Sequence, residues 1–440
     1  MGRRNLAWLA GLALAILVVA TWPVVRAGIW AGGEPASATT RAVAQVPGGI
    51  PRDCSVDVTA RLQRWIDAQP DGDAGDPQVL DLGAGCFRLG SAQAGTRGAR
   101  GDLGPRNGLL LIGRMHLVLR GSARLVAVGE AAADGGSPIP RALVWIEDSD
   151  DVLVTGADVD RDGRVGPVER LRIEGTHRGG RYDPVREHDH GIRILGGHRI
   201  RVRNVAIERS WGDGVYVGPS PTRGRAEPAR EVEVSDSVIR DSGRHAISCV
   251  GCDGLRVRDN RLTDVGYWVI DLEQQLALVP IRDVAITGNE AQGARYGFTA
   301  ISAVGSAAAG IADVVVRANT FTNSQTCLEF VSINGAEAVG ARAPTERITI
   351  SDNVFHVNQH GILARDVTEL TVTGNRGVTR SARSCPLAPG PGLPDRYALL
   401  VALPGTAGLT LGDNSFAAAE DDGPRIPTAE LVRVTAPRNG

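Results

Sequence analysis

The 440-residue chain contains no lysine, and its 48 basic residues are all arginine. A mechanism that depends on a lysine base is therefore excluded. Aromatic residues make up only 4% of the chain, whereas glycine occurs 56 times, and this composition favours a turn-rich β protein over a helical bundle. The formal net charge is −2, so the sequence predicts no strong attraction to nucleic acid or to an anionic membrane surface.

An apolar run at residues 6–25 follows two arginines near the N-terminus. The run is about long enough to cross a bilayer as a helix, and the positive-inside rule then places the rest of the chain outside the cytoplasm. Residues 1–27 are predicted to be an uncleaved signal anchor or, with a cleavage site at residues 25–27, a signal peptide. Residues 28–50 are predicted to be a flexible tether. We therefore expect an extracytoplasmic protein, either anchored by its N-terminal helix or secreted.

Six cysteines in an exported chain predict disulfide bonds. Two pairings are suggested, Cys54 with Cys86, which bracket the first folded segment, and Cys327 with Cys385. A CxxC motif at residues 249–252 has no other nearby ligands in the sequence, so a zinc site there is disfavoured. A short-loop disulfide or a pair of buried thiols is predicted instead.

A short helix and a repeated two-strand unit are predicted for the body of the chain. Asp57 is predicted to cap a helix in which Val58, Leu62, Trp65 and Ile66 share one face. From about residue 108, a short alternating strand followed by a turn with Asn or Asp recurs, as in GLRVRDNRL, DVAITGNEA and RITISDNVF. Each unit holds a second short strand, as in DHGIRIL, GDGVYVG, RHAISCV and WVIDLEQ. About two dozen residues per unit, with few tight hairpin turns, is the spacing of a β-solenoid rather than of a sandwich or propeller.

Residues 51–416 resemble the right-handed parallel β-helix of the pectin-lyase-like superfamily. The opening SVDVTARLQRWID…VLDLGAGCFRL is similar to the capping segment with which many members begin. The segments GDGVYVG, RHAISCV and WVIDLEQ resemble a subgroup in which such motifs fall on successive coils. The resemblance implies an all-β, single-stranded right-handed parallel β-helix with an N-terminal capping helix, followed by a C-terminal tail at residues 417–440. It does not select one reaction, because this fold carries many activities.

Alternate side chains of each second strand point to opposite faces of the sheet. The interior set is predicted to be Ile192, Ile194, Val215, Val217, Ile247, Cys249, Ile270 and Leu272. The outward set is predicted to be Arg193, Tyr216, Ser248, Asp271, Ser302 and Glu329. When the units are aligned, the residues at the strand entrance are His190, Asp213, His245, Trp268, Thr299, Thr326 and His360.

Acids, histidines, arginines and aromatics concentrate on the four units at 187–273, and we expect them to form an exposed strip. Coils stack about 4.8 Å apart, so Asp213 is expected beside His190 and Arg244, with Asp271 about 10 Å away along the axis. The candidate catalytic residues are Asp213, His245 and Asp271. The candidate substrate-binding residues are Asp189, His190, Arg193, Tyr216, Arg244, Tyr267, Trp268 and Glu273. The alternative is that acids and histidines beside glycine are ordinary turn residues, which is also our interpretation of His360.

Three functions are compatible with this strip. Similarity to polygalacturonases implies a glycoside hydrolase, because Asp213 and His245 stand where that pattern has an Asp and a His; His190 and Gly212 depart from it. A lyase or epimerase acting on uronate sugars would need a base such as Tyr216 or a histidine, together with arginines that neutralise the carboxylate of the sugar. Arginines in the loop at 219–230 would hold an acidic polymer, and they favour this second function. A cell-surface protein that binds glycans or has a structural role, without turnover, is the third. Under each of the three functions we expect a monomer.

Residues 158–169 match the D-x-D-x-D-G-x5-E pattern of calcium loops. The flanking sequence is strand-like, and a β-helix corner with the same residues is the alternative. We expect no required cofactor, with calcium as the one candidate ion.

Overall fold

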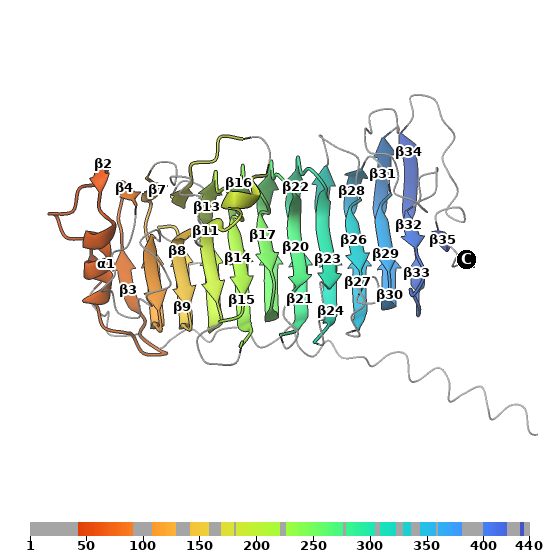
Figure 1. The fold of residues 1–440 in the computed structure, drawn as a ribbon, viewed down its shortest axis with the longest axis horizontal. Helices are drawn as coiled ribbons and strands as arrows, with labels where there is room; N and C mark the ends of the chain where they lie inside the picture. The colour runs from red at the N-terminus through yellow and green to blue at the C-terminus, as the bar shows by residue number, and fades with distance from the viewer. Residues whose placement is uncertain are drawn as a thin grey trace, which may run out of the picture. The chain divides into compact units, whose positions relative to one another are not determined.

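The computed structural model describes residues 43–90, 108–128, 141–157, 169–179, 182–220, 226–275, 279–303, 309–322, 329–335, 344–357, 360–380, 399–419 and 432–434. Over these residues the chain forms three long parallel sheets, one α-helix, α1 (Thr59–Asp67), and one 3-10 helix, η1 (Pro184–Arg186) (Figure 1).

The strands of the first sheet are, in order, β1 (Ala44–Gln45), β3 (Gln78–Asp81), β6 (Met115–Arg120), β9 (Asp150–Thr155), β12 (His198–Arg203), β15 (Ala229–Ser235), β18 (Cys252–Arg258), β21 (Ile281–Thr287), β24 (Ile311–Arg317), β27 (Thr345–Ser351), β30 (Thr368–Thr373) and β33 (Thr410–Gly412). Those of the second sheet are β2 (Asp53–Asp57), β4 (Cys86–Leu89), β7 (Arg124–Ala127), β10 (Leu171–Glu174), β13 (Val205–Glu208), β16 (Val238–Arg240), β19 (Arg261–Thr263), β22 (Glu290–Gln292), β25 (Thr320–Thr322), β28 (Val354–Val357), β31 (Arg376–Arg380) and β34 (Ser415–Ala419). Those of the third sheet are β5 (Leu109–Ile112), β8 (Arg141–Glu147), β11 (Asp189–Leu195), β14 (Val215–Gly218), β17 (Ile247–Cys249), β20 (Trp268–Gln274), β23 (Gly297–Ala303), β26 (Val331–Asn334), β29 (Ile362–Arg365), β32 (Leu400–Ala402) and β35 (Val432–Val434).

Neighbouring strands in each sheet are parallel and three elements apart along most of the chain, so each coil contributes one strand to every sheet. This is a parallel β-helix, and the predicted all-β fold class is confirmed. The sheets run slightly past the predicted limits at both ends. Strand β1, before residue 51, pairs with β3, and β35, within residues 417–440, pairs with β32.

Helix α1 packs against β5, the edge strand of the third sheet. The Gln63 side chain accepts from the Leu110 backbone N–H (2.7 Å) and donates to the Leu110 carbonyl (2.9 Å), so it satisfies the edge strand. The predicted helix face is confirmed, because its four apolar residues are buried. Asp57 accepts from the Thr59 backbone N–H (2.9 Å) one residue before the N-cap position, which Val58 occupies. The capping helix is thus as predicted, with the cap displaced by one residue.

The predicted interior residues of the third sheet are fully buried in one continuous core. A ladder of asparagines runs beside this core at the turn between the first and second sheets, through Asn260, Asn289, Asn319, Asn353, Asn375 and Asn414. Each amide donates to a backbone carbonyl of a neighbouring coil, and every one except that of Asn414 also donates to the next asparagine about 3.0 Å away. The residue before each ladder asparagine has a positive φ, for example Asp259 (φ 57). Asp or Gly, which tolerate this conformation, precedes five of the six asparagines, and this preference explains the recurring DN and GN pairs; Ala318 (φ 54) is the exception.

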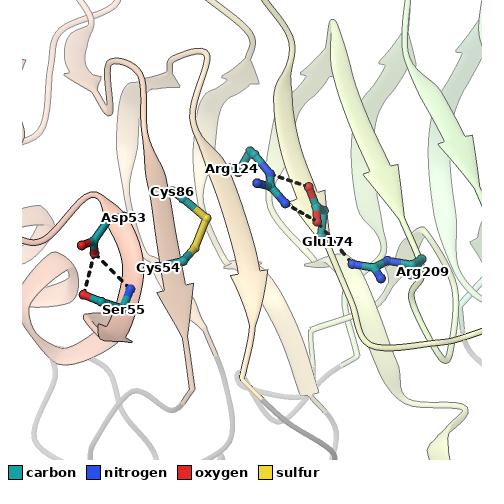
Figure 2. The surroundings of a disulfide bond; sticks show 7 residues. All are labelled: Asp53, Cys54, Ser55, Cys86, Arg124, Glu174 and Arg209. Atoms are coloured by element: carbon teal, nitrogen blue, oxygen red, sulfur yellow. Dashed lines mark hydrogen bonds and ion pairs between the residues drawn. A yellow bond between two sulfur atoms is a disulfide. The ribbon is translucent and has the colours of Figure 1, made fainter.

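The first coils are also cross-linked at the second sheet, as Figure 2 shows. The predicted bond between Cys54 and Cys86 is present. Farther along the same sheet, the buried carboxylate of Glu174 accepts from Arg124 (2.8 Å) and Arg209 (3.3 Å) (Figure 2). The hydrogen bond from Arg124 is the main reason that the pKa of Glu174 lies below its usual value.

The CxxC motif also forms a disulfide, between Cys249 and Cys252, with both residues buried in the core. The predicted pair of Cys327 and Cys385 lies outside the described residues, as do the N-terminal segment 1–42 and the calcium-loop pattern up to residue 168. Within the described part of the chain, no helix is long and apolar enough to span a membrane.

Candidate functional site

The third sheet aligns the candidate residues in two rows. The outer row is made by residues paired across consecutive strands: Trp145, Arg193, Tyr216, Ser248, Asp271 and Ala300. The entrance row is made by the residues two positions before the paired interior residues: His190, Asp213, His245, Trp268, Gly297, Glu329 and His360. The predicted order of the four central coils is therefore confirmed.

The predicted alignment is wrong on two later coils, by two residues at Thr299 and by three at Thr326, whereas His360 lies in the entrance row as predicted. Strand β23 begins at Gly297, so Thr299 pairs with Ile270 and is buried in the interior, where an aliphatic residue was expected. Ser302 consequently pairs with Glu273 and not with Asp271. Glu329 moves from the outer row to the entrance row, and Thr326 lies outside the described residues.

The central residues are buried and do not form an exposed strip. The exposed fraction is 0% for Asp213, 1% for His245, 3% for His190 and 5% for Asp271. Aromatic rings cover them: Tyr216 stacks on His190 with ring centroids 4.8 Å apart, and Tyr267 packs edge-on against His245 at 5.4 Å. The expected exposure is wrong because neighbouring side chains in the two rows are large enough to cover the short Asp and His side chains.

The Asp213 carboxylate accepts hydrogen bonds from two residues of the next coil. Its Oδ2 accepts from the Ser248 hydroxyl (2.7 Å), and its Oδ1 accepts from the His245 backbone N–H (3.1 Å). The guanidinium of Arg244 lies 3.7 Å from Oδ2. Burial raises the pKa of Asp213; Arg244, Ser248 and the His245 N–H oppose this rise without cancelling it. Asp213 is therefore fully occupied by protein groups.

His190 is a neutral imidazole with a defined tautomer. Its Nδ1 accepts from the Asp213 backbone N–H (3.1 Å), so the ring proton is on Nε2. The Nδ1 atom also lies 3.5 Å from Asp213 Oδ2, but this contact is not an ion pair, because Nδ1 already uses its lone pair. Burial lowers the pKa of His190 well below its usual value. With no lone pair left, His190 is a poor candidate for a base.

His245 has the opposite tautomer. Its Nδ1 donates to the Trp268 carbonyl (3.1 Å), which leaves the lone pair on Nε2, 3.3 Å from Asp271 Oδ2. Burial and then Arg244 lower the pKa of His245 well below its usual value, whereas burial and then Glu273 raise that of Asp271 well above it. Both shifts favour a proton on Asp271 that faces the lone pair of a neutral histidine.

Arg244 connects the acidic residues of the site. Its guanidinium lies 3.5 Å from Glu273 Oε2 as well as beside Asp213. Burial alone would lower the pKa of Arg244, but the carboxylates of Asp213 and Glu273 raise it. The Glu273 carboxylate also accepts from the Gln275 amide (2.6 Å). Glu273 is half-buried, so of these carboxylates it is the one that borders solvent.

An aromatic group flanks the acids. Tyr267 packs on Tyr296 with centroids 4.3 Å apart, Trp268 stacks with Tyr296 at 6.3 Å, and Tyr182 lies 5.6 Å from Tyr267. All four rings are half-buried. They provide the apolar surface that sugar-binding clefts need beside their polar groups.

Asp189 and Arg193, two other predicted binding residues, contact different groups from the residues described above. Asp189 accepts from Arg186 (3.2 Å), whose guanidinium lies 4.0 Å from the Trp211 ring centroid. Asp189, His190 and Trp211 line a small hollow with room for about one water molecule. Arg193 lies between the rings of Trp145 and Tyr216.

Several site residues were not predicted. Ser248 was in the outward set but was not recognised as the partner of Asp213. Tyr182 and Glu187 lie in the segment before β11, where the Tyr182 hydroxyl donates to Glu187, and no repeat pattern identifies them. Tyr296 stands one residue before β23, so the two-residue alignment error concealed its position beside Trp268.

No group of three or more His, Cys, Asp or Glu side chains that could hold a metal ion occurs in the described residues. Arg230 belongs to the loop at 219–230 that was predicted to hold an acidic polymer, and it is ion-paired with Asp253 (3.4 Å). Residues 221–225 of this loop are not among the described residues.

A family model described as a right-handed β-helix region matches residues 190–378. No curated protein matches the chain. Among solved structures, endo-xylogalacturonan hydrolase from Aspergillus tubingensis is similar at 12% identity and a TM-score of 0.57, covering 91% of this chain and 100% of that one. The A-module of mannuronan C-5 epimerase AlgE6 from Azotobacter vinelandii has 14% identity and a TM-score of 0.55, covering 86% and 87%. The surface adhesin PfbA of Streptococcus pneumoniae has 13% identity and a TM-score of 0.55, covering 86% and 98%.

At these identities the structural likeness establishes the fold and not the reaction, and the three proteins have three different functions. Together with the three parallel sheets and the family match over residues 190–378, it identifies the fold as a right-handed parallel β-helix.

Proposed function

We propose that the protein is an extracytoplasmic glycoside hydrolase that binds a polysaccharide over the third sheet. Asp271 is the general acid and Glu273 the second carboxylate, acting as base toward water. The observation that carries this proposal is the contrast between two acids on one strand: Asp271 is buried with a raised pKa, and Glu273 is ion-paired with Arg244 at the solvent boundary. Paired carboxyl groups in contrasting environments are the arrangement that glycoside hydrolysis requires.

The carboxyl groups of Asp271 and Glu273 lie on the same face of the third sheet. They are two residues apart on β20 and alternate with the buried Ile270 and Leu272, so both face outward. Two residues of strand rise about 6.6 Å, close to the carboxyl separation of roughly 6.5–9.5 Å that leaves room for an attacking water in inverting enzymes. Inversion at the anomeric carbon is therefore the expected outcome.

Asp213 and His245 act as positioning residues in this scheme. Asp213 fixes Arg244 and the start of β17, and His245 faces the proton-bearing carboxyl of Asp271. Tyr267, Trp268 and Tyr296 would stack on sugar rings beside the acids. The solved relatives that are named as acting on polysaccharides, a hydrolase and an epimerase, agree with a carbohydrate ligand.

An extracytoplasmic location is supported by the two disulfides of the β-helix, which persist in oxidising compartments. We propose that the protein is a monomer there, held by residues 1–27 as an anchor or released after cleavage.

A uronate lyase or epimerase is the second candidate, because His245 presents a lone pair on Nε2 next to the cationic Arg244. The other suggested bases fit less well: the lone pair of His190 is occupied, and burial raises the pKa of Tyr216, which disfavours its deprotonation.

The test incubates the full-length protein with neutral and uronic-acid polysaccharides and follows reducing ends, ultraviolet absorbance of unsaturated products, and anomeric configuration by NMR. New reducing ends without unsaturation, lost in Asp271→Asn, support hydrolysis. Unsaturated products, or C5 inversion without cleavage, would establish the second candidate. Bound glycan without any product would mean a binding protein.

A further inference from the structure

Arg193 is held between two aromatic rings. It pairs with Trp145 on β8 and with Tyr216 on β14 in the outer row. Its guanidinium carbon lies 4.6 Å from the Trp145 ring centroid and 5.1 Å from that of Tyr216. A guanidinium remains charged at any ordinary pH, and the two rings fix the plane of this one.

Two nitrogens of this cation lack a hydrogen-bonding partner among the described residues. Its Nε and Nη1 atoms are buried, and no described acceptor lies within hydrogen-bond distance of either. Arg186 and Arg244 nearby each lie within 4 Å of a carboxylate. Arg193 thus differs from the other half-buried arginines of this face.

The acids around Arg193 are engaged elsewhere. Glu147 accepts from the Trp145 indole N–H (3.0 Å), and Asp213 accepts from Ser248 and from the His245 backbone. Leaving a buried cation without hydrogen-bond acceptors costs several kcal/mol, and cation–π contacts offset only about 0.5–2 kcal/mol of this. The acceptor that completes the site must therefore come from outside the described chain.

We infer that Arg193 forms a subsite for an anionic group on the polysaccharide, a carboxylate or a sulfate ester, and that it determines specificity for an acidic polymer. The planar fork of a guanidinium binds such oxyanions through two parallel hydrogen bonds. Arg193 is half-buried, so part of its side chain borders the outer face, from which a ligand would approach.

The position of this subsite relative to the acids rests on the proposed function. Arg193 and Asp271 belong to the same outer row, three coils apart, which is about 14 Å along the axis. The anionic sugar is therefore not the one whose glycosidic bond is cleaved. A chain that reaches both residues runs along the helix axis over Tyr216 and Ser248.

The test measures equilibrium binding by titration calorimetry in an Asp271→Asn background, which prevents consumption of the ligand. The probes are polygalacturonic acid and alginate, the same polymers with their carboxyl groups reduced to alcohols, and dextran sulfate. We expect Arg193→Met to weaken binding of the anionic polymer by about 10- to 100-fold, and to leave the weak binding of the reduced polymer unchanged. Arg261→Met, an exposed arginine on β19 of the second sheet, should change neither.

Preference for carboxylate polymers over dextran sulfate identifies a uronate, and the reverse identifies a sulfate ester. Arg193→Lys keeps the positive charge but lacks the planar guanidinium, so we expect it to bind the anionic polymer with intermediate affinity. This variant replaces Arg193→Met in the test if Arg193→Met unfolds at a lower temperature than the parent protein. Any of three results would overturn the inference. The first is that Arg193→Met binds the anionic polymer as tightly as the Asp271→Asn protein without that change. The others are that the Asp271→Asn protein binds acidic and reduced polymers equally well, or that it binds no anionic polymer. Because binding is read without turnover, failure of the hydrolase proposal is recognised separately, by activity that survives in Asp271→Asn.

Discussion

The Nε2 atom of His245 lies 3.3 Å from Oδ2 of Asp271, while the Nδ1 atom of the same ring donates to the Trp268 carbonyl. The hydrogen bond to Trp268 fixes the tautomer, so the atom that faces Asp271 carries a lone pair. Such a contact is favourable when Asp271 holds a proton, which agrees with its raised pKa. His245 therefore helps to keep a buried carboxyl in the protonated state that a general acid needs.

The first prediction concerns the basic limb of the pH–rate profile. Asp271 is active while protonated, so activity falls as the pH rises through its raised pKa. His245→Asn can keep the hydrogen bond to Trp268 but lacks Nε2, which removes the group that stabilises the proton on Asp271. We expect the basic limb of kcat/KM to move to lower pH in this variant. A basic limb at the same pH as in the wild type would show that His245 does not act on Asp271.

A second prediction separates positioning by Asp213 from substrate contact. Asp213→Asn keeps the size of the side chain but removes the charge that faces Arg244 and directs an N–H toward Ser248 or His245. We expect kcat to fall by about 10- to 100-fold, while the dissociation constant of a bound oligosaccharide changes less than threefold. Glu290→Gln, at an exposed site on β22, is the matched control and should behave as the wild type. A Kd that rises as much as kcat falls would instead place Asp213 in contact with the sugar.

The sequence was informative where the fold repeats and misleading where it does not. Alternation on β11, β14, β17 and β20 predicted the interior set and the order of Asp213, His245 and Asp271, because a parallel β-helix keeps equivalent positions in register. The period failed at β23, where Thr299 takes an interior place that aliphatic residues take on the preceding coils. Burial of Asp213 and the tautomers of His190 and His245 depend on which rings and backbone groups lie across coils, and no local pattern encodes them.

A third prediction concerns stability and Glu329. This side chain is 4% exposed, and burial raises its pKa to about 7, compared with about 4.3 in an unfolded chain. Between these two values the folded state retains a proton that the unfolded state has lost, so the stability gained from the raised pKa is full below about pH 4 and declines as the pH rises to 7. We expect Glu329→Gln to remove about 4 kcal/mol of this pH dependence, so that its melting temperature relative to the wild type is higher at pH 8 than at pH 4. An identical difference at both pH values would contradict a buried, neutral Glu329.

A fourth prediction concerns the asparagine ladder. The Asn319 amide donates to the Ile286 carbonyl (2.9 Å) and to Asn353 (3.0 Å), and its oxygen accepts from the backbone and side chain of Asn289. Asn319→Ala leaves several of these buried groups without partners, at about 1–3 kcal/mol for each. We expect a loss of about 3–5 kcal/mol in the free energy of unfolding, measured by denaturant titration. Thr320→Ala, at the exposed neighbour, should cost less than about 1 kcal/mol; equal effects of the two changes would show that the ladder adds little.

The most direct test of the central claim is the comparison of kcat and oligosaccharide binding for Asp271→Asn and Glu273→Gln, with Glu290→Gln alongside, on the polysaccharide that the activity screen identifies. The account predicts that each site variant loses at least 100-fold in kcat, retains binding, and unfolds at the temperature of the wild type, while the control is unaffected. Full activity in either site variant, with reducing ends still released by the wild type, would contradict the assignment of Asp271 and Glu273 as the acid and the base.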